Sequence, residues 1–203
     1  MHICYEVCCV YGRAEKLRKS DLSRKGSVDA PIENFLNNLN KHPDYVSLSS
    51  CSGRIIIFVS SDNVKKGCTW ILVKHETVTE GDETWSKVKE QAGKTGILTL
   101  KFEPFILHVQ CRHLEAAKKL QTLASEVGFR NSGFTFGKAG KIVLAIRSTH
   151  GLQVPLSDEK GDLLIEEPYL DFLLRQANMK LGQNAEKIHK LEKNCEVLFK
   201  HDD

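Results

Sequence analysis

Residues that could do chemistry gather in this sequence beside apolar runs. The clearest group is the polar run Ser49-Ser50-Cys51-Ser52-Gly53-Arg54, which comes directly before Ile55-Ile56-Ile57. Small hydroxyl side chains and a glycine let backbone N–H groups approach a ligand closely, and an arginine offers a planar fork for a carboxylate or a phosphate. A plain hairpin turn is the simpler interpretation. Because the run is longer than a two-residue turn requires, we favour a functional centre.

Two further polar groups follow predicted elements in the second half of the chain. The first is Arg130-Asn131-Ser132-Gly133, after a helix, and the second is Arg147-Ser148-Thr149-His150-Gly151, directly after an apolar strand. The second group places a cation, two hydroxyls, an imidazole and a flexible backbone together. Either could be an ordinary polar loop. His108 differs because it lies inside an apolar strand, where a structural histidine is as plausible as a functional one.

Common nucleotide and metal motifs are not matched. In Gly133–Lys141 neither Gly-Lys pair has a glycine five residues upstream or a following Ser or Thr, so this is not a phosphate loop. No Gly-x-Gly-x-x-Gly fingerprint of a Rossmann fold follows a strand. The Cys111-Arg112-His113 stretch with His108 could gather soft ligands, but it lacks the paired spacing of a zinc site, so we expect no metal.

Composition narrows the class of protein. The chain has 203 residues, 41% hydrophobic and 27% charged, which suits one large globular domain or two small lobes. Its formal charge of +3 permits an anionic partner without proving one. The seven scattered cysteines are odd in number, which favours free thiols in a reducing compartment such as the cytoplasm. The apolar runs are too short to span a bilayer, and no signal peptide is recognisable.

Periodicity predicts the elements that must position these residues. Asp29 is a plausible helix N-cap, with Pro31 in the first turn and a buried face recurring over Ile32–Leu39. A second amphipathic helix is predicted over Leu114–Val127, closed by Gly128. A short helix is predicted over Thr84–Gln91. Strands are predicted over Tyr45–Ser50, Arg54–Ser60, Cys68–His75, Gly96–Phe102, Phe105–Arg112, Lys141–Arg147 and Leu152–Pro155.

The tail from Tyr169 to Phe199 reads as one long helix. Its apolar stripe, interrupted by Asn184, could form a coiled coil, but we favour packing against its own domain. The order helix–strand–strand–strand occurs twice, and Ser52–Ile57 echoes Ala139–Leu144 in opening an apolar strand with a small-residue turn and a basic residue. We therefore predict an α+β fold with a mixed, largely antiparallel sheet, which two similar α/β halves could build, and a long C-terminal helix.

Five blocks of the sequence, taken together, resemble the tRNA wybutosine-synthesizing protein 3 family. They occur in the family's order and cover most of the chain, roughly Lys16 to Tyr169. The blocks are Asp21–Asp29, Ser49–Arg54, Phe102–Val109, Gly128–Gly133 and Ile146–Gly151. Residues 1–11 depart from the family's usual start. We accordingly expect an atypical N-terminal extension over 1–11 and a single catalytic domain over 12–203, with the long helix starting at about 168.

The resemblance implies an enzyme that is not a Rossmann methyltransferase. It implies transfer of a methyl group from S-adenosylmethionine to ring nitrogen N4 of the tricyclic guanosine derivative 7-aminocarboxypropyl-demethylwyosine. That base lies next to the anticodon of phenylalanine tRNA, on the pathway to wybutosine. The implied partner is therefore the anticodon loop of this tRNA, and we expect a monomer that associates with no membrane.

Such a reaction assigns roles to the polar groups. His150 and His108 are the leading candidates for a general base, with Asp29 as an alternative. Cys51 is not expected to act as a nucleophile, because direct transfer to nitrogen needs no covalent adduct. The candidates for binding the donor or the RNA are Ser23, Lys25, Ser49, Ser50, Cys51, Ser52, Gly53, Arg54, Arg130, Asn131, Ser132, Gly133, Arg147, Ser148, Thr149 and Gly151.

Two other classes of protein fit the sequence less well. A non-catalytic RNA-binding module should show exposed aromatic residues for base stacking, but aromatics make up only 7% of the chain and mostly fall in apolar patterns. A small-molecule hydrolase should show a nucleophile, a base and an orienting group, and no recognised signature supports such a set. Binding of S-adenosylmethionine discriminates the transferase from both rivals.

Overall fold

A computed structural model describes residues 27–60, 68–79 and 83–201. The chain divides into two compact units, and each is described by itself. Unit 1 contains residues up to Ser52, Phe105–Thr149 and the chain from Glu186; unit 2 contains Gly53–Pro104 and His150–Ala185. The expected extension over residues 1–11 and the candidates Ser23 and Lys25 lie outside the described residues.

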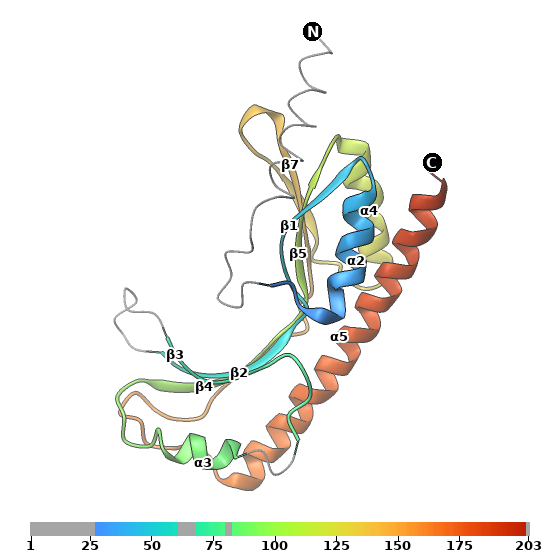
Figure 1. Ribbon diagram of the computed structural model, residues 1–203. Coiled ribbons are helices and arrows are strands. Elements are labelled where there is room, and N and C mark those ends of the chain that lie inside the picture. The colour runs from blue at the N-terminus through green and yellow to red at the C-terminus, as the bar shows by residue number, and fades with distance from the viewer. Residues whose placement is uncertain (1–26, 61–67, 80–82, 202–203) are drawn as a thin grey trace. The chain divides into compact units, whose positions relative to one another are not determined.

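Unit 1 is built on a four-stranded sheet in the order β1-β5-β7-β6, and every pairing in it is antiparallel. Helices α2 and α4 and the second part of α5 lie on one side of this sheet (Figure 1). The elements are α2 (Ala30–Lys41), β1 (Tyr45–Cys51), β5 (Ile106–Cys111), α4 (Leu114–Glu126), β6 (Gly133–Phe136), a 3-10 turn (Lys138–Gly140), β7 (Ile142–Arg147) and α5 (Glu167–His201).

Helix α2 forms where its apolar spacing predicts it. Ile32, Phe35, Leu36 and Leu39 are buried on one face, and a proline stands in the first turn, where its missing N–H costs nothing. The prediction that the Asp29 side chain caps this helix is wrong. Asp29 does occupy the N-cap position, but it makes no side-chain cap hydrogen bond. Its carboxylate instead accepts from the backbone N–H of Ser52.

Helix α4 has a cap at each end. The ring Nδ1 of His113, the N-cap residue, accepts a hydrogen bond from the backbone N–H of Ala116 at 3.1 Å. Gly128 follows the C-cap with a φ of +99°, a left-handed conformation that favours glycine. Cys111, at the end of β5, is buried in the core of unit 1. Cys111 and His113 thus have structural roles.

Unit 2 carries the second four-stranded antiparallel sheet, in the order β3-β2-β4-β8. Helix α3 and the first part of α5 cover one side of it (Figure 1). Its strands and short helix are β2 (Arg54–Ser60), β3 (Thr69–Lys74), α3 (Thr84–Lys89), β4 (Ile97–Glu103) and β8 (Leu152–Pro155). The Glu103-Pro104 dipeptide lies between β4 and β5, and these two strands belong to different sheets.

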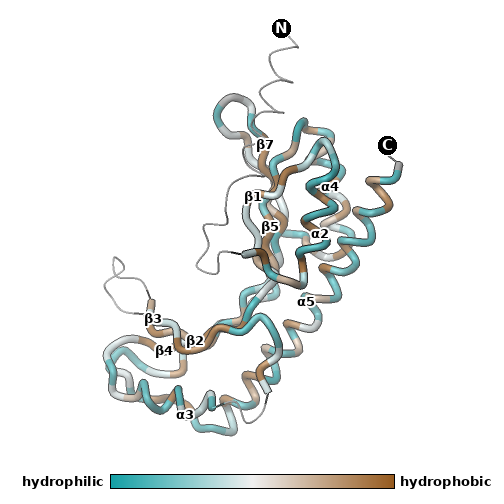
Figure 2. The backbone as a smooth tube through the Cα atoms, in the orientation of Figure 1, coloured by the Kyte–Doolittle hydropathy of each residue, from teal (hydrophilic) through white to brown (hydrophobic). Residues whose placement is uncertain are grey.

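Each unit has its own apolar core between its sheet and its helices. In unit 1, Leu107 and Val109 of β5 alternate with the less buried His108 and Gln110, so the odd-numbered side chains face the helices. In unit 2, Ile55 and Ile57 of β2 play the same part. Figure 2 shows hydrophobic stretches along the strands, and alternating hydrophobic and hydrophilic stretches along the helices. In unit 1 the opposite face of the sheet carries the polar positions of β5, whereas in unit 2 the opposite face also holds Ile56, which is 1% exposed.

The long C-terminal helix packs into the chain's own cores, as favoured over a coiled coil. Ala177 and Leu181 belong to the core of unit 2, and Ile188, Leu191 and Cys195 belong to the core of unit 1. The helix begins at Glu167, next to the predicted start. Among the described residues, no helix has both the length and the apolar character that crossing a bilayer requires.

The predicted fold class is confirmed: the chain is α+β, with antiparallel sheets and a long C-terminal helix. The two sheet-bearing units are interleaved along the chain rather than consecutive. The segments whose sequences echo each other open strands β2 and β7, and each of these strands lies between two neighbours in its own sheet. Strand β6 was not predicted, because a four-residue strand that starts with glycine gives little periodic signal.

Candidate functional site

Three polar side chains meet on the sheet of unit 1. Ser49 of β1 pairs with His108 of β5, and His108 pairs with Ala145 of β7. Arg147 follows Ala145 by two residues, so it lies on the same face of β7. We call Ser49, His108, Gln110, Ala145 and Arg147 the polar face. In the described part of the chain, helices pack only against the opposite face of this sheet.

His108 is held from both sides of its ring. Its Nδ1 lies 3.0 Å from the Ser49 hydroxyl, and its Nε2 lies 3.3 Å from Nη2 of Arg147. A guanidinium can only donate hydrogen bonds, so Nε2 must be the acceptor in this contact. The ring hydrogen is then on Nδ1 and is donated to the Ser49 oxygen. Arg147 therefore fixes the tautomer of His108.

This arrangement keeps the imidazole neutral. Partial burial, and then the positive charge of Arg147, lower the pKa of His108 below its ordinary value of 6.5. A neutral imidazole with a defined tautomer is a competent base at neutral pH once its lone pair is accessible. The lone pair is the one on Nε2, the atom that Arg147 contacts.

Arg147 is positioned by the loop that follows α4. The backbone N–H of Arg147 donates to the Ser132 hydroxyl at 3.2 Å, and that hydroxyl donates to the carbonyl of Phe129 at 2.6 Å. The hydrogen bond between Ser132 and Arg147 therefore joins the two predicted polar groups, Arg130–Gly133 and Arg147–Gly151. Arg147 forms no ion pair with any carboxylate among the described residues, and it is exposed.

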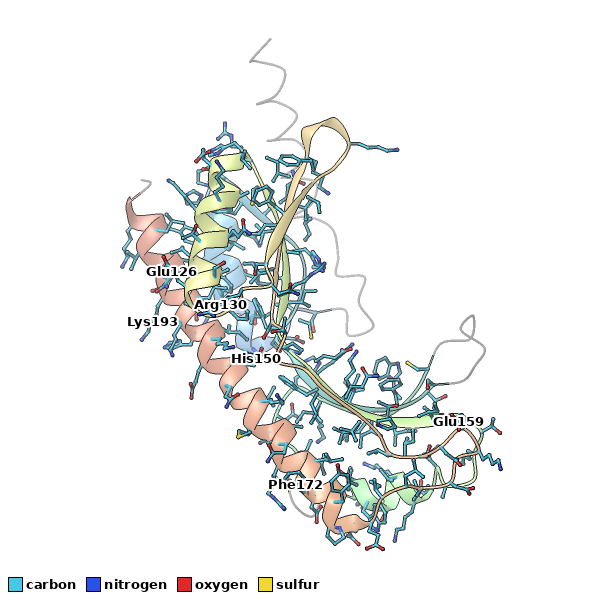
Figure 3. All side chains as sticks on the ribbon, turned by 180° about the vertical axis from the view of Figure 1, so that it is seen from behind. Glu126, Arg130, His150, Glu159, Phe172 and Lys193 are labelled. Atoms are coloured by element: carbon cyan, nitrogen blue, oxygen red, sulfur yellow. The ribbon has the colours of Figure 1, made fainter. Side chains whose placement is uncertain are left out.

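Arg130 lies near the end of α4 (Figure 3), and its charge acts on Lys187. Burial, and then the charge of Arg130, lower the pKa of Lys187 on α5. Carbonyls at a helix C-terminus favour cations, so the fold supports this pair. Two neighbouring cations with mutual repulsion make a plausible contact for a phosphate.

In unit 2, Arg54 is paired. Its Nε donates to the Glu103 carboxylate at 2.8 Å, across the paired strands β2 and β4. Lys101 contacts the other oxygen of Glu103 at 2.9 Å, and the Arg54 guanidinium lies 5.3 Å from the centre of the Trp70 ring. Burial alone would raise the pKa of Glu103, but the hydrogen bonds from Lys101 and Arg54 outweigh burial and lower it.

Comparison with known proteins decides the family. The family model described as "Methyltransferase TYW3" matches residues 13–197. The tRNA wybutosine-synthesizing protein 3 homolog of Homo sapiens is 46% identical over 187 residues, which cover 90% of this chain and 70% of that protein. The tRNA wybutosine-synthesizing protein 3 of Schizosaccharomyces pombe is 34% identical, covering 87% of this chain and 79% of that protein.

The chain belongs to the TYW3 methyltransferase family. Solved structures agree with this assignment at the level of the fold. The PH1069 protein of Pyrococcus horikoshii superposes with a TM-score of 0.76 at 30% identity, covering 93% of both chains. A protein of Aeropyrum pernix superposes with a TM-score of 0.71 at 26% identity, covering 84% of this chain and 98% of that one. The predicted family and the predicted enzyme class, a methyltransferase, are confirmed.

As a methyltransferase, the chain needs a methyl donor, and the two arginines differ in what they offer to one. The Arg147 guanidinium uses one described contact, on a neutral imidazole, and keeps donors for an anion. Arg54 already neutralises a carboxylate. The chemistry of the polar face therefore suits the carboxylate of a donor or a phosphate of tRNA, and Arg54 is the weaker candidate.

The turn between β1 and β2 explains part of the polar run on structural grounds. Gly53 has a φ of +105°, and a Cβ there would lie 2.8 Å from the Asn184 side-chain nitrogen and 3.2 Å from the Glu103 carbonyl. The His75 ring nitrogen lies 3.1 Å from the Gly53 carbonyl. Ser52 is 4% exposed. Gly53 and Ser52 are thus fixed by the fold before any ligand is considered.

The remaining candidates lie at strand ends, at the start of a helix or in loops. Ser50 and Cys51 end β1, opposite Leu107 and Ile106. Asp29 is 7% exposed and holds the Ser52 N–H at 2.8 Å. The others are exposed or half-buried loop residues: Asn131, Ser148, Thr149, His150 and Gly151, with Gly133 opening β6.

Glu103 was missed as a site residue by sequence reasoning. It falls in a block that carries the family resemblance, but its role depends on facing Arg54, which is 49 residues away in the sequence. One signal for this pair was available in the sequence. An acidic residue ends one predicted strand, and an arginine of opposite charge begins another. Only the register of β2 against β4 shows that the two meet.

Proposed function

We propose that this TYW3-family enzyme transfers a methyl group from S-adenosylmethionine to a ring nitrogen, N4, of 7-aminocarboxypropyl-demethylwyosine next to the anticodon of phenylalanine tRNA. The proposal is supported by two relatives that are named for wybutosine synthesis and that match most of the chain. The observation that carries the chemistry is the contact chain Ser49–His108–Arg147 on the polar face. This chain of contacts places a neutral base, His108, next to Arg147, a cation that can bind an anionic ligand.

S-adenosylmethionine would supply an electrophilic methyl group and present a carboxylate, an ammonium, a ribose and an adenine to the protein. Arg147 suits the carboxylate, because its planar fork has donors beyond the one used on His108. The hydroxyl of Ser49 suits a ribose or a base edge, because its oxygen already accepts from His108 and its own hydrogen remains to be donated. Arg130, beside Lys187, suits a phosphate of the RNA.

The chain's own contribution to the reaction is positioning and proton transfer. Holding two reactants in line can supply much of the acceleration. If the acceptor nitrogen carries a hydrogen, His108 takes that proton at Nε2, and the Nδ1 hydrogen bond to Ser49 stabilises the imidazolium that forms. Arg147 must leave Nε2 for this to happen, and pairing with an anionic ligand gives it a stronger partner.

The other two base candidates are weaker. Asp29 is buried and its carboxylate already accepts from the backbone N–H of Ser52, so proton transfer through it would weaken that hydrogen bond. His150 is exposed, whereas both ring nitrogens of His108 have described partners. We rank His108 first, His150 second and Asp29 third.

The proposal extends to the setting of the reaction. The cytoplasm is the expected location, a monomer the expected state, and residues 12–203 the expected catalytic domain. The cysteine composition supports a reducing compartment.

The deciding experiment incubates the protein with S-adenosylmethionine and hypomodified phenylalanine tRNA, then measures the mass of the released nucleoside. A gain of one methyl on the tricyclic base is the expected result. An unchanged mass, with tRNA shown to carry the precursor base, contradicts the proposal. Titration of S-adenosylmethionine into the protein by calorimetry tests the donor separately.

A further inference from the structure

The hairpin formed by β6 and β7 extends beyond the rest of its sheet. Ile142 is the first paired residue of β7, opposite both Cys111 of β5 and Phe136 of β6. Residues 137–141 therefore lie beyond the last residue pair that β5 forms with β7, in the loop that connects β6 to β7 (Figure 1). This is the segment that the sequence excludes as a phosphate loop, and the contacts on the polar face do not use it.

The hairpin turn has a defined backbone. The N–H of Gly137 donates to the carbonyl of Lys141 at 2.7 Å, and Lys138–Gly140 form a 3-10 turn between them. Gly140 has a φ of +73°, which lets the chain reverse in so few residues. A turn fixed in this way holds its side chains in place before a partner arrives, and less ordering entropy is then lost on binding.

An aromatic side chain stands next to this turn. Phe136 is 65% exposed, and its ring meets Phe134 edge to face, with centroids 5.8 Å apart. Phe134 is partly buried and packs against the core of unit 1, so its ring supports that of Phe136. A single exposed phenylalanine carries no functional meaning by itself. Its neighbours decide what it can bind.

Those neighbours are cationic. Lys138 and Lys141 are exposed and follow Phe136 by two and five residues. Neither pairs with a carboxylate among the described residues. Between residues 127 and 157 the sequence contains no Asp or Glu, while Arg130 and Arg147 add two more cations. An exposed aromatic ring in a stretch whose charged residues are all cationic is suited to binding a polyanion that also offers flat apolar surfaces.

We propose that the β6–β7 hairpin is an RNA-binding element, in which Phe136 stacks on an unpaired base and Lys138 and Lys141 contact flanking phosphates. The proposal rests on the proposed tRNA substrate and goes beyond it by assigning a contact outside the polar face. Unpaired bases are the target because the bases of a duplex are already stacked on each other. The anticodon loop is the part of the tRNA that offers them.

The test measures binding by fluorescence anisotropy in the absence of donor. The probes are an anticodon stem–loop RNA and a fully paired RNA duplex of equal length. Phe136→Ala should weaken stem–loop binding roughly five- to one-hundred-fold, the range found for loss of one base–aromatic stack, and should leave duplex binding unchanged. Phe136→Leu should lose as much as alanine, because leucine keeps apolar bulk without a stacking face, and Phe136→Trp should retain the affinity.

The lysines are tested through salt dependence. Lys138→Gln and Lys141→Gln should each reduce the slope of log Kd against log salt concentration by about 0.7, as for the loss of one phosphate contact to a single strand. Lys118→Gln on α4 is the matched control, since it removes one exposed lysine of the same unit that pairs with Glu115. Its slope should equal that of the unaltered protein.

Three results would overturn the proposal. One is stem–loop binding by Phe136→Ala equal to that of the unaltered protein. Another is an equal loss of duplex and stem–loop binding. A third is a dependence on Phe136 for binding phosphatidylserine vesicles with none for RNA, which would indicate a membrane contact. Circular dichroism and thermal melting of each variant show that the fold is intact.

Failure of this proposal can be told apart from failure of the proposed function. If the stem–loop affinity depends on Phe136 and no methyl group is gained, the hairpin proposal stands and the proposed reaction fails. If methyl transfer occurs and the KM for tRNA is the same in Phe136→Ala, the reaction stands and the hairpin proposal fails. Calorimetric titration of S-adenosylmethionine should give the same Kd for Phe136→Ala and the unaltered protein.

Discussion

The arginine that ends β7 and the arginine that begins β2 each lie at one end of a strand in a four-stranded antiparallel sheet, yet their surroundings differ. Arg147 contacts a neutral imidazole, and its charge lowers the pKa of that imidazole. Arg54 contacts a carboxylate that also takes a lysine, so its charge is compensated within unit 2. The partner of a cation, more than the residue type or its place in a strand, decides whether it is available to a ligand.

The largest effect should separate these two arginines. Arg147→Ala should lower kcat/KM for methyl transfer about 10²- to 10³-fold, the usual result of removing one preorganised donor. Arg54→Ala should lower kcat/KM by less than about tenfold, which is under ~1.4 kcal/mol of transition-state stabilisation. Both are measured by methyl transfer to tRNA under kcat/KM conditions. Equal losses in the two variants would remove the distinction drawn between the units.

The pH profile sharpens the same comparison. His108 must be neutral to accept from Arg147 or to take a proton, so kcat/KM should fall as the pH drops through its lowered pKa, below 6.5. Removing Arg147 removes one cause of that lowered pKa, so the pKa should rise and the acid limb should move to higher pH. The measurement is kcat/KM against pH for the unaltered protein and Arg147→Ala.

His150→Gln serves as the control for this profile. Its acid limb should coincide with that of the unaltered protein, because His108 is still present. A limb that disappears in His150→Gln and persists in His108→Gln would make His150 the base.

Glu103 gives a smaller, structural effect. Glu103→Gln should lower the free energy of unfolding by about 1 kcal/mol near neutral pH, because the carboxylate takes charged hydrogen bonds from two half-exposed cations. Its folded pKa lies below the ordinary 4.5, so this stability is present above pH 4.5 and is lost as the pH falls through the lowered pKa. Urea unfolding on both sides of pH 4.5 measures the difference, which should shrink at the lower pH.

Cys51 should show the smallest effect. Cys51→Ser should keep kcat within about a factor of two, because transfer to nitrogen needs no covalent thiol adduct. Single-turnover methyl transfer measures this directly. Loss of turnover with donor and tRNA binding intact would assign Cys51 a chemical role and weaken the case for the polar face.

Local pattern was enough to predict most elements and not enough to predict the site. The face of α2 over Ile32–Leu39 and the strand Arg54–Ser60 follow from spacing and β-branched residues. The contact of Ser49 with His108 joins residues 59 apart, and it depends on a register shift in β1 between Ser47 and Ser49. No periodicity reports where two distant strands come into register. The side-chain capping by Asp29 was predicted wrongly for the same reason, since its partner, Ser52, is 23 residues away.

The interleaving of the two units has a consequence for how this chain reaches its structure. The sheet of unit 1 requires β1 to find β5, and that of unit 2 requires β4 to find β8, in each case across about fifty or more intervening residues. Loop-closure entropy must be lost before such pairings are rewarded, so we expect slow folding compared with a helical bundle of this length. No single cut of the chain releases either unit whole, because segments of each unit lie on both sides of a segment of the other.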